Sequence, residues 1–128
     1  MRKIDVFNHI YPPAYHERLM SVAPDYKDIG KRMRNIPMLA DLDVRFRVMD
    51  AFDDYHQVLS LPTPPIEVFA SGADAIDLAR TANDGMADLV RRYPDRFPAF
   101  VASLPLADPD AAARELHRRT TVGPPRRP

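Results

Sequence analysis

Residues 71–105, SGADAIDLARTANDGMADLVRRYPDRFPAFVASLP, contain the helix and the strand that decide the fold class. Apolar residues recur at spacings of three and four until Pro94, which predicts a long amphipathic helix that ends before this proline. Residues 97–102 follow and are mainly apolar, as is typical of a buried parallel strand. The apolar stripe of the helix consists of Ala75, Ala79, Ala82, Met86, Leu89 and Tyr93.

Two β-prone segments precede this helix. Residues 3–7, KIDVF, predict a first strand, and residues 57–61, QVLSL, predict a second strand that ends at Pro62. Helical segments separate these strands from each other and from residues 97–102. Strands that alternate with helices form a parallel sheet with right-handed crossovers, so the predicted fold class is α/β.

Each predicted helix carries a start signal. Residues 12–13 are a proline pair that suits a first helical turn, and Asp108 precedes a proline in the same way at the last helix. Ser71, with an acidic residue three positions later, resembles a capping box. Asp41 is the expected N-cap of an amphipathic helix. The apolar stripe expected for that helix is Leu42, Phe46, Met49 and Phe52.

Two stretches depart from the strand and helix pattern. Residues 24–40 show no clear period, so we interpret them as an excursion after the first strand. Residues 120–128 hold three prolines and a glycine where a fourth apolar strand is expected. We therefore predict one structured unit over residues 1–119 and a disordered or unrelated tail over residues 120–128.

The composition excludes several classes of function. The 128 residues, 45% of them hydrophobic, are enough for one domain. Lys plus Arg and Asp plus Glu number 18 each, so we expect neither a nucleic acid nor a membrane as a partner. No cysteine is present, which excludes disulfides, thiolate metal sites and a Cys nucleophile. We expect a cytoplasmic chain, because the first residues lack the hydrophobic region of a signal peptide.

Polar residues follow each predicted strand, where active sites of parallel α/β folds lie. We expect Asn8 and His9 after the first strand, Ser60 at the end of the second, and Ser103 after the third. Phe7, His9, Ser60 and Ser103 are therefore expected near one common edge of the sheet. The sequence places no base beside either serine in a recognisable arrangement. A serine nucleophile therefore has little support.

Several motifs, in order along the chain, resemble a known family. They are residues 4–13 (IDVFNHIYPP), 43–50 (DVRFRVMD), 57–60 (QVLS), 82–84 (AND), 94–97 (PDRF) and 99–107 (AFVASLPLA). Over residues 3–117 the chain resembles the amidohydrolase superfamily, in the metal-dependent decarboxylase-like branch that includes aminocarboxymuconate-semialdehyde decarboxylase. The resemblance implies a (β/α)8 TIM barrel that binds a divalent metal, expected to be Zn²⁺, and a small carboxylated or cyclic substrate. It leaves decarboxylases and hydrolases both open.

The first family motif is altered at one position. The branch usually reads His-x-His there, because residues i and i+2 of a strand point to the same side and can converge on one metal. This chain has Phe7 at the first of these positions, so His9 is the remaining candidate metal ligand. The resemblance places the other ligands on later strands, beyond residue 128.

The length indicates only part of such a barrel. A complete (β/α)8 barrel needs about 250 residues, whereas the sequence predicts about three βα units. We therefore expect an amino-terminal fragment that is inactive alone and tends to self-associate through exposed strand edges. The alternative is a non-catalytic α/β binding or assembly module, in which Phe7 fills the former metal position.

One basic residue is a candidate for substrate binding. The charged residues of the helix after Asp41 are interpreted mainly as a solvated face with pairs such as Asp43 with Arg47. Arg47 is also a candidate contact for a substrate carboxylate, because a guanidinium suits that geometry. The charged residues assigned to the solvated face are Asp41, Asp43, Arg45, Arg47 and Asp50.

Overall fold

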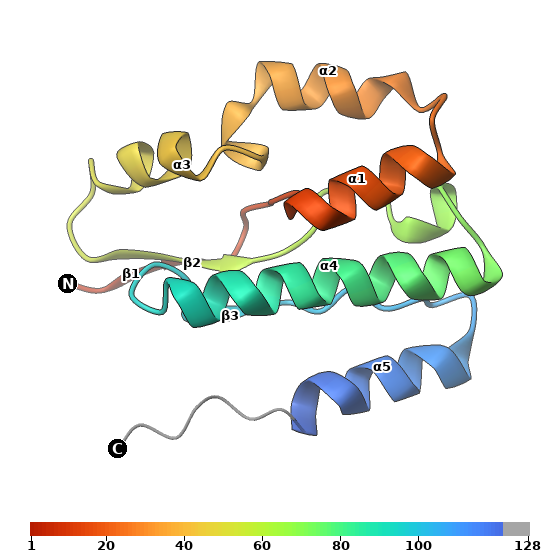
Figure 1. The fold of residues 1–128 in the computed structure, drawn as a ribbon. Coiled ribbons are helices and arrows are strands. Elements are labelled where there is room, and N and C mark those ends of the chain that lie inside the picture. Colours follow the sequence, from red (N-terminus) through yellow and green to blue (C-terminus); the bar gives the residue numbers. More distant parts are fainter. Residues whose placement is uncertain (122–128) are drawn as a thin grey trace.

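A three-stranded parallel sheet lies at the centre of the fold (Figure 1). In the computed structural model, which describes residues 1–121, the strands are β1 (Lys3–Asp5), β2 (Tyr55–Leu59) and β3 (Ala99–Phe100), in the order β1-β2-β3. Ile4 pairs with His56, and Leu59 pairs with Phe100. The predicted α/β class and the parallel strands in sequence order are confirmed.

The first strand is shorter than predicted. It ends at Asp5, whose Oδ1 atom accepts a hydrogen bond of 2.9 Å from the backbone N–H of Phe7. This bond gives the Phe7 N–H a partner outside the sheet, and regular pairing with β2 ends at Asp5. Phe7 and His9 therefore lie in the connection that follows the strand.

Four of the helices begin near the predicted positions. They are α1 (Pro13–Val22), α3 (Leu42–Met49), α4 (Gly72–Arg92) and α5 (Pro109–Thr121). Asp41 accepts from the N–H of Val44 at 3.0 Å, and Asp108 accepts from the N–H of Ala111 at 2.9 Å, so both predicted caps are confirmed. Ser71 precedes α4 but makes no capping bond through its side chain, so the predicted capping box is wrong.

The excursion contains regular structure that its sequence pattern did not indicate. Residues 24–40 include α2 (Lys27–Asn35) and the 3₁₀ helix η1 (Pro37–Leu39). Ile29 on α2 is fully buried, so tertiary packing stabilises a helix too short to show a clear period. A second 3₁₀ helix, η2 (Ile66–Val68), lies between β2 and α4.

The predicted tail overlaps the last helix. α5 continues to Thr121, two residues into the stretch assigned to the tail. Residues 122–128, where the rest of that prediction falls, lie outside the described residues. No helix within residues 1–121 is both long enough and apolar enough to cross a membrane.

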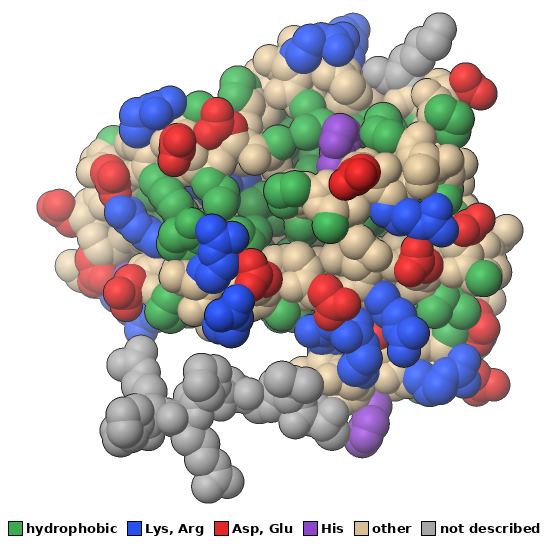
Figure 2. Space-filling model, in the orientation of Figure 1, with side chains coloured by type: hydrophobic (Ala, Val, Ile, Leu, Met, Phe, Trp, Pro, Cys, Tyr) green, Lys and Arg blue, Asp and Glu red, His purple; other side chains and the backbone are tan. Residues whose placement is uncertain are grey.

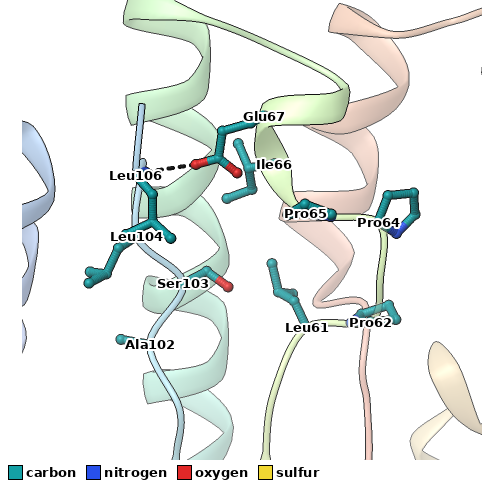
Figure 3. Close-up of a pocket in the computed structure, with 10 residues that line it drawn as sticks. All are labelled: Leu61, Pro62, Pro64, Pro65, Ile66, Glu67, Ala102, Ser103, Leu104 and Leu106. Atoms are coloured by element: carbon teal, nitrogen blue, oxygen red, sulfur yellow. Dashed lines mark hydrogen bonds between the residues drawn. The ribbon is translucent and has the colours of Figure 1, made fainter. Parts of the chain in front are cut away.

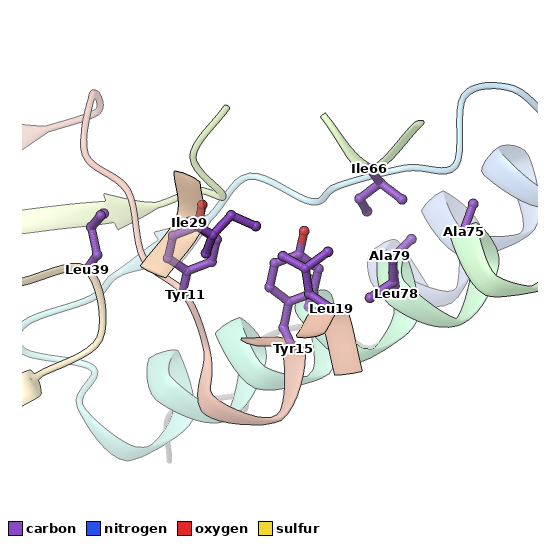
Figure 4. Packing of buried hydrophobic residues seen from close by; sticks show 10 residues of the cluster. Tyr11, Tyr15, Leu19, Ile29, Leu39, Ile66, Ala75, Leu78 and Ala79 are labelled. Atoms are coloured by element: carbon purple, nitrogen blue, oxygen red, sulfur yellow. The ribbon is translucent and has the colours of Figure 1, made fainter. Parts of the chain in front are cut away.

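Two apolar clusters hold the layers together. One lies where α1 and α4 meet and includes Tyr15, Leu19 and Leu78 (Figure 4). The other joins α3, the strands and the end of α4. Its buried members are Ile10, Met49, Leu59, Met86, Leu89 and Phe97.

The predicted stripe of α4 is buried from Ala75 to Leu89, as expected. Phe52 is 54% exposed, because α3 ends at Met49, so its assignment to the buried stripe of that helix is wrong.

Gly85 allows α4 to approach the start of α1. A Cβ atom at this position would lie 2.5 Å from the Cβ of Pro12. Glycine in a helix interior costs about 1 kcal/mol relative to alanine. Close packing of the two segments is the reason for a glycine in the middle of this helix.

The surface charges are mixed. On the face shown in Figure 2, acidic and basic side chains lie beside one another around a group of apolar side chains. Ion pairs such as Arg18 with Asp74 and Asp77 join α1 to α4. This arrangement agrees with a net charge of zero.

Candidate functional site

His9 and Ser60 meet at the carboxyl ends of β1 and β2. The Nδ1 atom of His9 lies 3.0 Å from the Oγ atom of Ser60. The Ser60 hydroxyl donates to the carbonyl oxygen of Asn8 at 2.7 Å, and the Ser60 carbonyl accepts from the N–H of Ile10 at 2.9 Å. The two strand ends are therefore joined on both sides of the histidine, as the expected common edge requires.

Arg45 on α3 lies beneath this junction and is only 1% exposed. Its guanidinium donates to the carbonyl oxygens of His9 and Met38, and to the Gln57 Oε1 atom at 2.7 Å. It also donates to the Asn8 Oδ1 atom at 3.3 Å. These bonds hold the backbone of the loop that carries His9.

The burial of Arg45 corrects a sequence-based interpretation. The predicted assignment of this residue to a solvated helix face is wrong. The helical spacing that predicts the buried stripe of α3 also includes Arg45, which lies three residues after Leu42 and four before Met49. Its charge led to the wrong assignment, because arginine is almost never buried unless it is paired.

Burial also changes the proton affinity of Arg45. Loss of solvent lowers its pKa from the usual value to about 10, against the opposing attraction of the nearby Asp5 carboxylate. The guanidinium is still positively charged at neutral pH. Asp5 in turn accepts from the Tyr55 hydroxyl at 2.8 Å, so a charged group and its neighbours form one network beneath the sheet edge.

Phe7 lies next to His9 and is 83% exposed. The two rings meet edge to face, with centroids 5.1 Å apart and planes inclined by 74°. A phenyl ring has no lone pair for a metal, and within residues 1–121 no group of three His, Asp or Glu side chains could hold a metal ion. These residues alone do not fit a complete metal site, although His9 could supply one ligand.

The end of β3 is held by a different side chain. Asn83, fully buried on α4, accepts from the N–H of Ser103 and donates to its carbonyl oxygen, both at 2.8 Å. The Asn83 amide also donates to Glu115 on α5 at 2.8 Å. Neither role was predicted, although Asn83 lies in the motif of residues 82–84, because a polar side chain within an apolar helix pattern gives no signal of its partner.

A small open cavity lies between the ends of β2 and β3 (Figure 3). It has a volume of about 220 Å³ and apolar walls that include Leu61, Pro62 and Leu104. Ser103 and Glu67 are its polar members, and Glu67 accepts from the N–H of Leu106 at 2.7 Å. Ser103 thus lies at the same edge of the sheet as Ser60, whereas His9 does not line this cavity.

Arg47 lies apart from these groups. It is exposed on α3, two residues beyond the buried Arg45, and its side chain makes no hydrogen bond or ion pair within residues 1–121. The predicted pair with Asp43 is therefore absent from the described chain. The proposed contact of Arg47 with a substrate carboxylate stays a prediction.

The structure places an imidazole beside Ser60 that sequence reasoning did not find. Distance alone, 3.0 Å between Oγ and Nδ1, suits a nucleophile and its base. The hydroxyl proton of Ser60, however, is directed to the carbonyl oxygen of Asn8. This geometry makes Ser60 a hydrogen-bonding residue of the loop and does not favour a nucleophile.

Comparisons with known proteins agree with the fold. No family model matches the chain. It is 47% identical over 79 residues to the gamma-resorcylate decarboxylase of Rhodococcus jostii, and the aligned region covers 62% of this chain and 24% of the relative. It is 36% identical over 90 residues to the 2-amino-3-carboxymuconate-6-semialdehyde decarboxylase of Dictyostelium discoideum, and the aligned region covers 70% of this chain and 25% of the relative.

A solved structure matches nearly the whole chain. It is the dihydroxybenzoic acid decarboxylase of Polaromonas sp. JS666 with bound manganese and the inhibitor 2-nitroresorcinol. The match has a TM-score of 0.72 and 35% identity, and covers 94% of this chain and 35% of that chain. The chain thus spans about a quarter of the curated relatives and about a third of this structure. The prediction of a partial TIM barrel is confirmed.

Proposed function

Because the chain is homologous to part of the metal-dependent decarboxylases of the amidohydrolase superfamily, we propose that it serves in a decarboxylase-like barrel. In that barrel it contributes the strand ends around His9. The reaction is cleavage of a C–C bond with release of CO2 from a small aromatic acid. The observation that carries this proposal is the match of 94% of the chain to the Polaromonas decarboxylase.

Decarboxylation is preferred to hydrolysis because the curated relatives reported above are named as decarboxylases. The hydrogen bond from Ser60 to the Asn8 carbonyl and the lack of cysteine argue only against a serine or cysteine nucleophile, and a metal-activated water needs neither.

His9 is the proposed metal ligand of this chain, and Arg47 is the proposed contact for a substrate carboxylate. The exposed guanidinium of Arg47 has no ion-pair partner within residues 1–121, so it is available to an anionic group. Zinc is our proposed metal, although the Polaromonas structure contains manganese. The remaining ligands must come from residues other than 1–121, so we expect no turnover from these residues alone.

A non-catalytic α/β module is the second candidate function. Phe7 supports it, because the first position of the usual His-x-His pair cannot bind a metal here. In such a module the edge-to-face contact between Phe7 and His9 would be a packing contact only.

A chimera distinguishes the two functions. Residues 3–117 replace the matched segment of the Polaromonas decarboxylase, in one version with Phe7 and in another with Phe7→His. We expect both chimeras to fold, and the Phe7→His version to bind manganese more tightly and to release more CO2 from gamma-resorcylate. The matched control adds His9→Ala to the Phe7→His version and should lose both gains.

The same experiment can refute the metal assignment. Metal content is measured by mass spectrometry and folding by circular dichroism. If both chimeras fold and His9→Ala leaves manganese binding unchanged, His9 is not a ligand and the non-catalytic module becomes the better account.

A further inference from the structure

The hydroxyl of Ser60 lies within hydrogen-bond distance of two polar atoms that differ in their ability to donate and accept. Its Oγ atom is 2.7 Å from the carbonyl oxygen of Asn8 and 3.0 Å from Nδ1 of His9. A carbonyl oxygen can only accept, and a serine hydroxyl has one proton. The proton of Ser60 therefore goes to Asn8, and the hydroxyl oxygen is left as an acceptor for His9.

We propose that Ser60 is a positioning residue that holds neutral His9 in its Nδ1–H tautomer and leaves the lone pair of Nε2 free. The hydrogen bond at one ring nitrogen of a histidine decides which nitrogen carries the proton. Nε2 has no hydrogen-bond partner within residues 1–121. The free lone pair would accept a divalent cation or a hydrogen-bond donor, and the inference does not depend on the proposed reaction.

The opposite arrangement would leave two acceptors in contact. If Ser60 donated to Nδ1, its oxygen and the Asn8 carbonyl oxygen would lie 2.7 Å apart without a proton between them. A distance of this size is typical of an O–H···O hydrogen bond. The spacing therefore favours the Nδ1–H tautomer.

The surrounding bonds keep the Asn8 carbonyl in place. The Asn8 side chain donates to the Val58 carbonyl at 2.9 Å and to the Asp5 carbonyl at 3.1 Å. Arg45 holds the next carbonyl, that of His9. These bonds hold the groups on either side of the Asn8 carbonyl, which keeps that oxygen beside the Ser60 hydroxyl.

Nitrogen NMR of the protein labelled at histidine tests the proposal directly. The two tautomers give different ¹⁵N shifts, and His9→Gln identifies the His9 signals among the four histidines. Spectra are recorded near pH 8, where an ordinary histidine, with a pKa of about 6.5, is neutral. We expect wild-type His9 to be mainly Nδ1–H, with an unprotonated Nε2.

Three variants separate positioning from general structure. Ser60→Ala should shift most of the His9 population to the Nε2–H tautomer, whereas Ser60→Thr, which keeps the hydroxyl, should retain the wild-type signal. Ser103→Ala is the matched control, because it removes the serine after the neighbouring strand and should leave the His9 signal unchanged.

Each result supports or overturns the assignment. A wild-type His9 that is mainly Nε2–H overturns it, and so does an unchanged spectrum in a folded Ser60→Ala variant. Should Ser60→Ala unfold, the wild-type spectrum and a folded Ser60→Thr variant still decide, since both must have the Nδ1–H tautomer.

Discussion

One buried polar side chain holds the chain after β1, and another holds the chain after β3. The two junctions differ in whether a polar atom beside them is left without a hydrogen-bond partner. Arg45 donates a hydrogen bond to the carbonyl of His9 in the loop after β1. Asn83 makes hydrogen bonds with the N–H and the carbonyl of Ser103 after β3. Each side chain comes from a helix that packs beside the sheet.

The Asn83 junction is closed. The Asn83 amide bonds the backbone of Ser103 and also donates to Glu115. Glu115 in turn accepts from Arg118 at 2.7 Å. At the Arg45 junction, by contrast, the His9 ring keeps one nitrogen without a partner in the described chain. The buried polar networks thus show where side chains hold the backbone. The ring nitrogen of His9 without a partner, at the edge of the Arg45 network, shows where a ligand could bind.

Removal of Arg45 should have the largest effect on stability. Arg45→Met would leave the carbonyls of His9 and Met38 and the Gln57 amide oxygen without their donor. We expect a loss of about 4 kcal/mol in the free energy of unfolding, measured by urea denaturation. Arg45→Lys keeps the charge and should lose less. A loss below about 1 kcal/mol for Arg45→Met would show that these bonds do not hold the loop.

Removal of Asn83 should cost somewhat less. Asn83→Ala deletes the bonds to Ser103 and Glu115 and leaves a small cavity in α4, so we expect about 3 kcal/mol of destabilisation. Thr81→Ala is the control, because this half-buried residue bonds only the Asp77 carbonyl of the same helix, and it should change stability by less than about 0.5 kcal/mol. Equal effects of the two substitutions in the same denaturation assay would contradict the assigned role of Asn83.

The Asn83 junction should also weaken in acid. Burial alone raises the pKa of Glu115, but hydrogen bonds from Arg118 and Asn83 outweigh it, so the net pKa lies below the ordinary value of 4.5. A carboxylate with a lowered pKa stabilises the fold fully above its unfolded pKa, and this contribution is lost as the pH falls through the folded pKa.

Glu115→Gln should therefore be less stable than wild type at neutral pH and flatten the fall in stability below pH 4.5. Thermal unfolding at several pH values measures this slope. A slope identical to that of wild type would mean that other carboxylates produce the acid sensitivity.

Substitution of Arg47 should have the smallest effect. Arg47→Ala removes an exposed side chain without a bond in the described chain, and we expect a change below about 0.5 kcal/mol in unfolding free energy. In an active chimera the same substitution should raise the KM for gamma-resorcylate if Arg47 binds the carboxylate. An unchanged KM would remove Arg47 from the site, whereas a large loss of stability would show that it has an internal role.

The predictable parts of the molecule depend on neighbours in sequence. Asp41 and Asp108 cap their helices because each side chain bonds an N–H three residues away. The apolar stripe of α4 is visible because its residues repeat with the period of a helix. The position of His9 after β1 was also predictable, because polar residues directly follow a short β-prone segment.

Other features depend on residues far apart in the chain. Gln57 and Asn8 accept bonds from Arg45, and these bonds make its burial favourable where its charge alone predicts exposure. α2 is stabilised by the burial of Ile29 against other helices, and a nine-residue segment has little helical stability of its own.

Periodicity, caps and proline positions, which act over a few residues, were sufficient to identify the α/β class, the strand order and the place of His9 after the first strand. Its candidacy as a metal ligand came from the family resemblance. The contact between His9 and Ser60 joins residues 51 positions apart, and the proton arrangement of that pair depends on a third group, the Asn8 carbonyl. Such an arrangement exists only after β1 and β2 have paired, because pairing brings the ends of the two strands within hydrogen-bond distance.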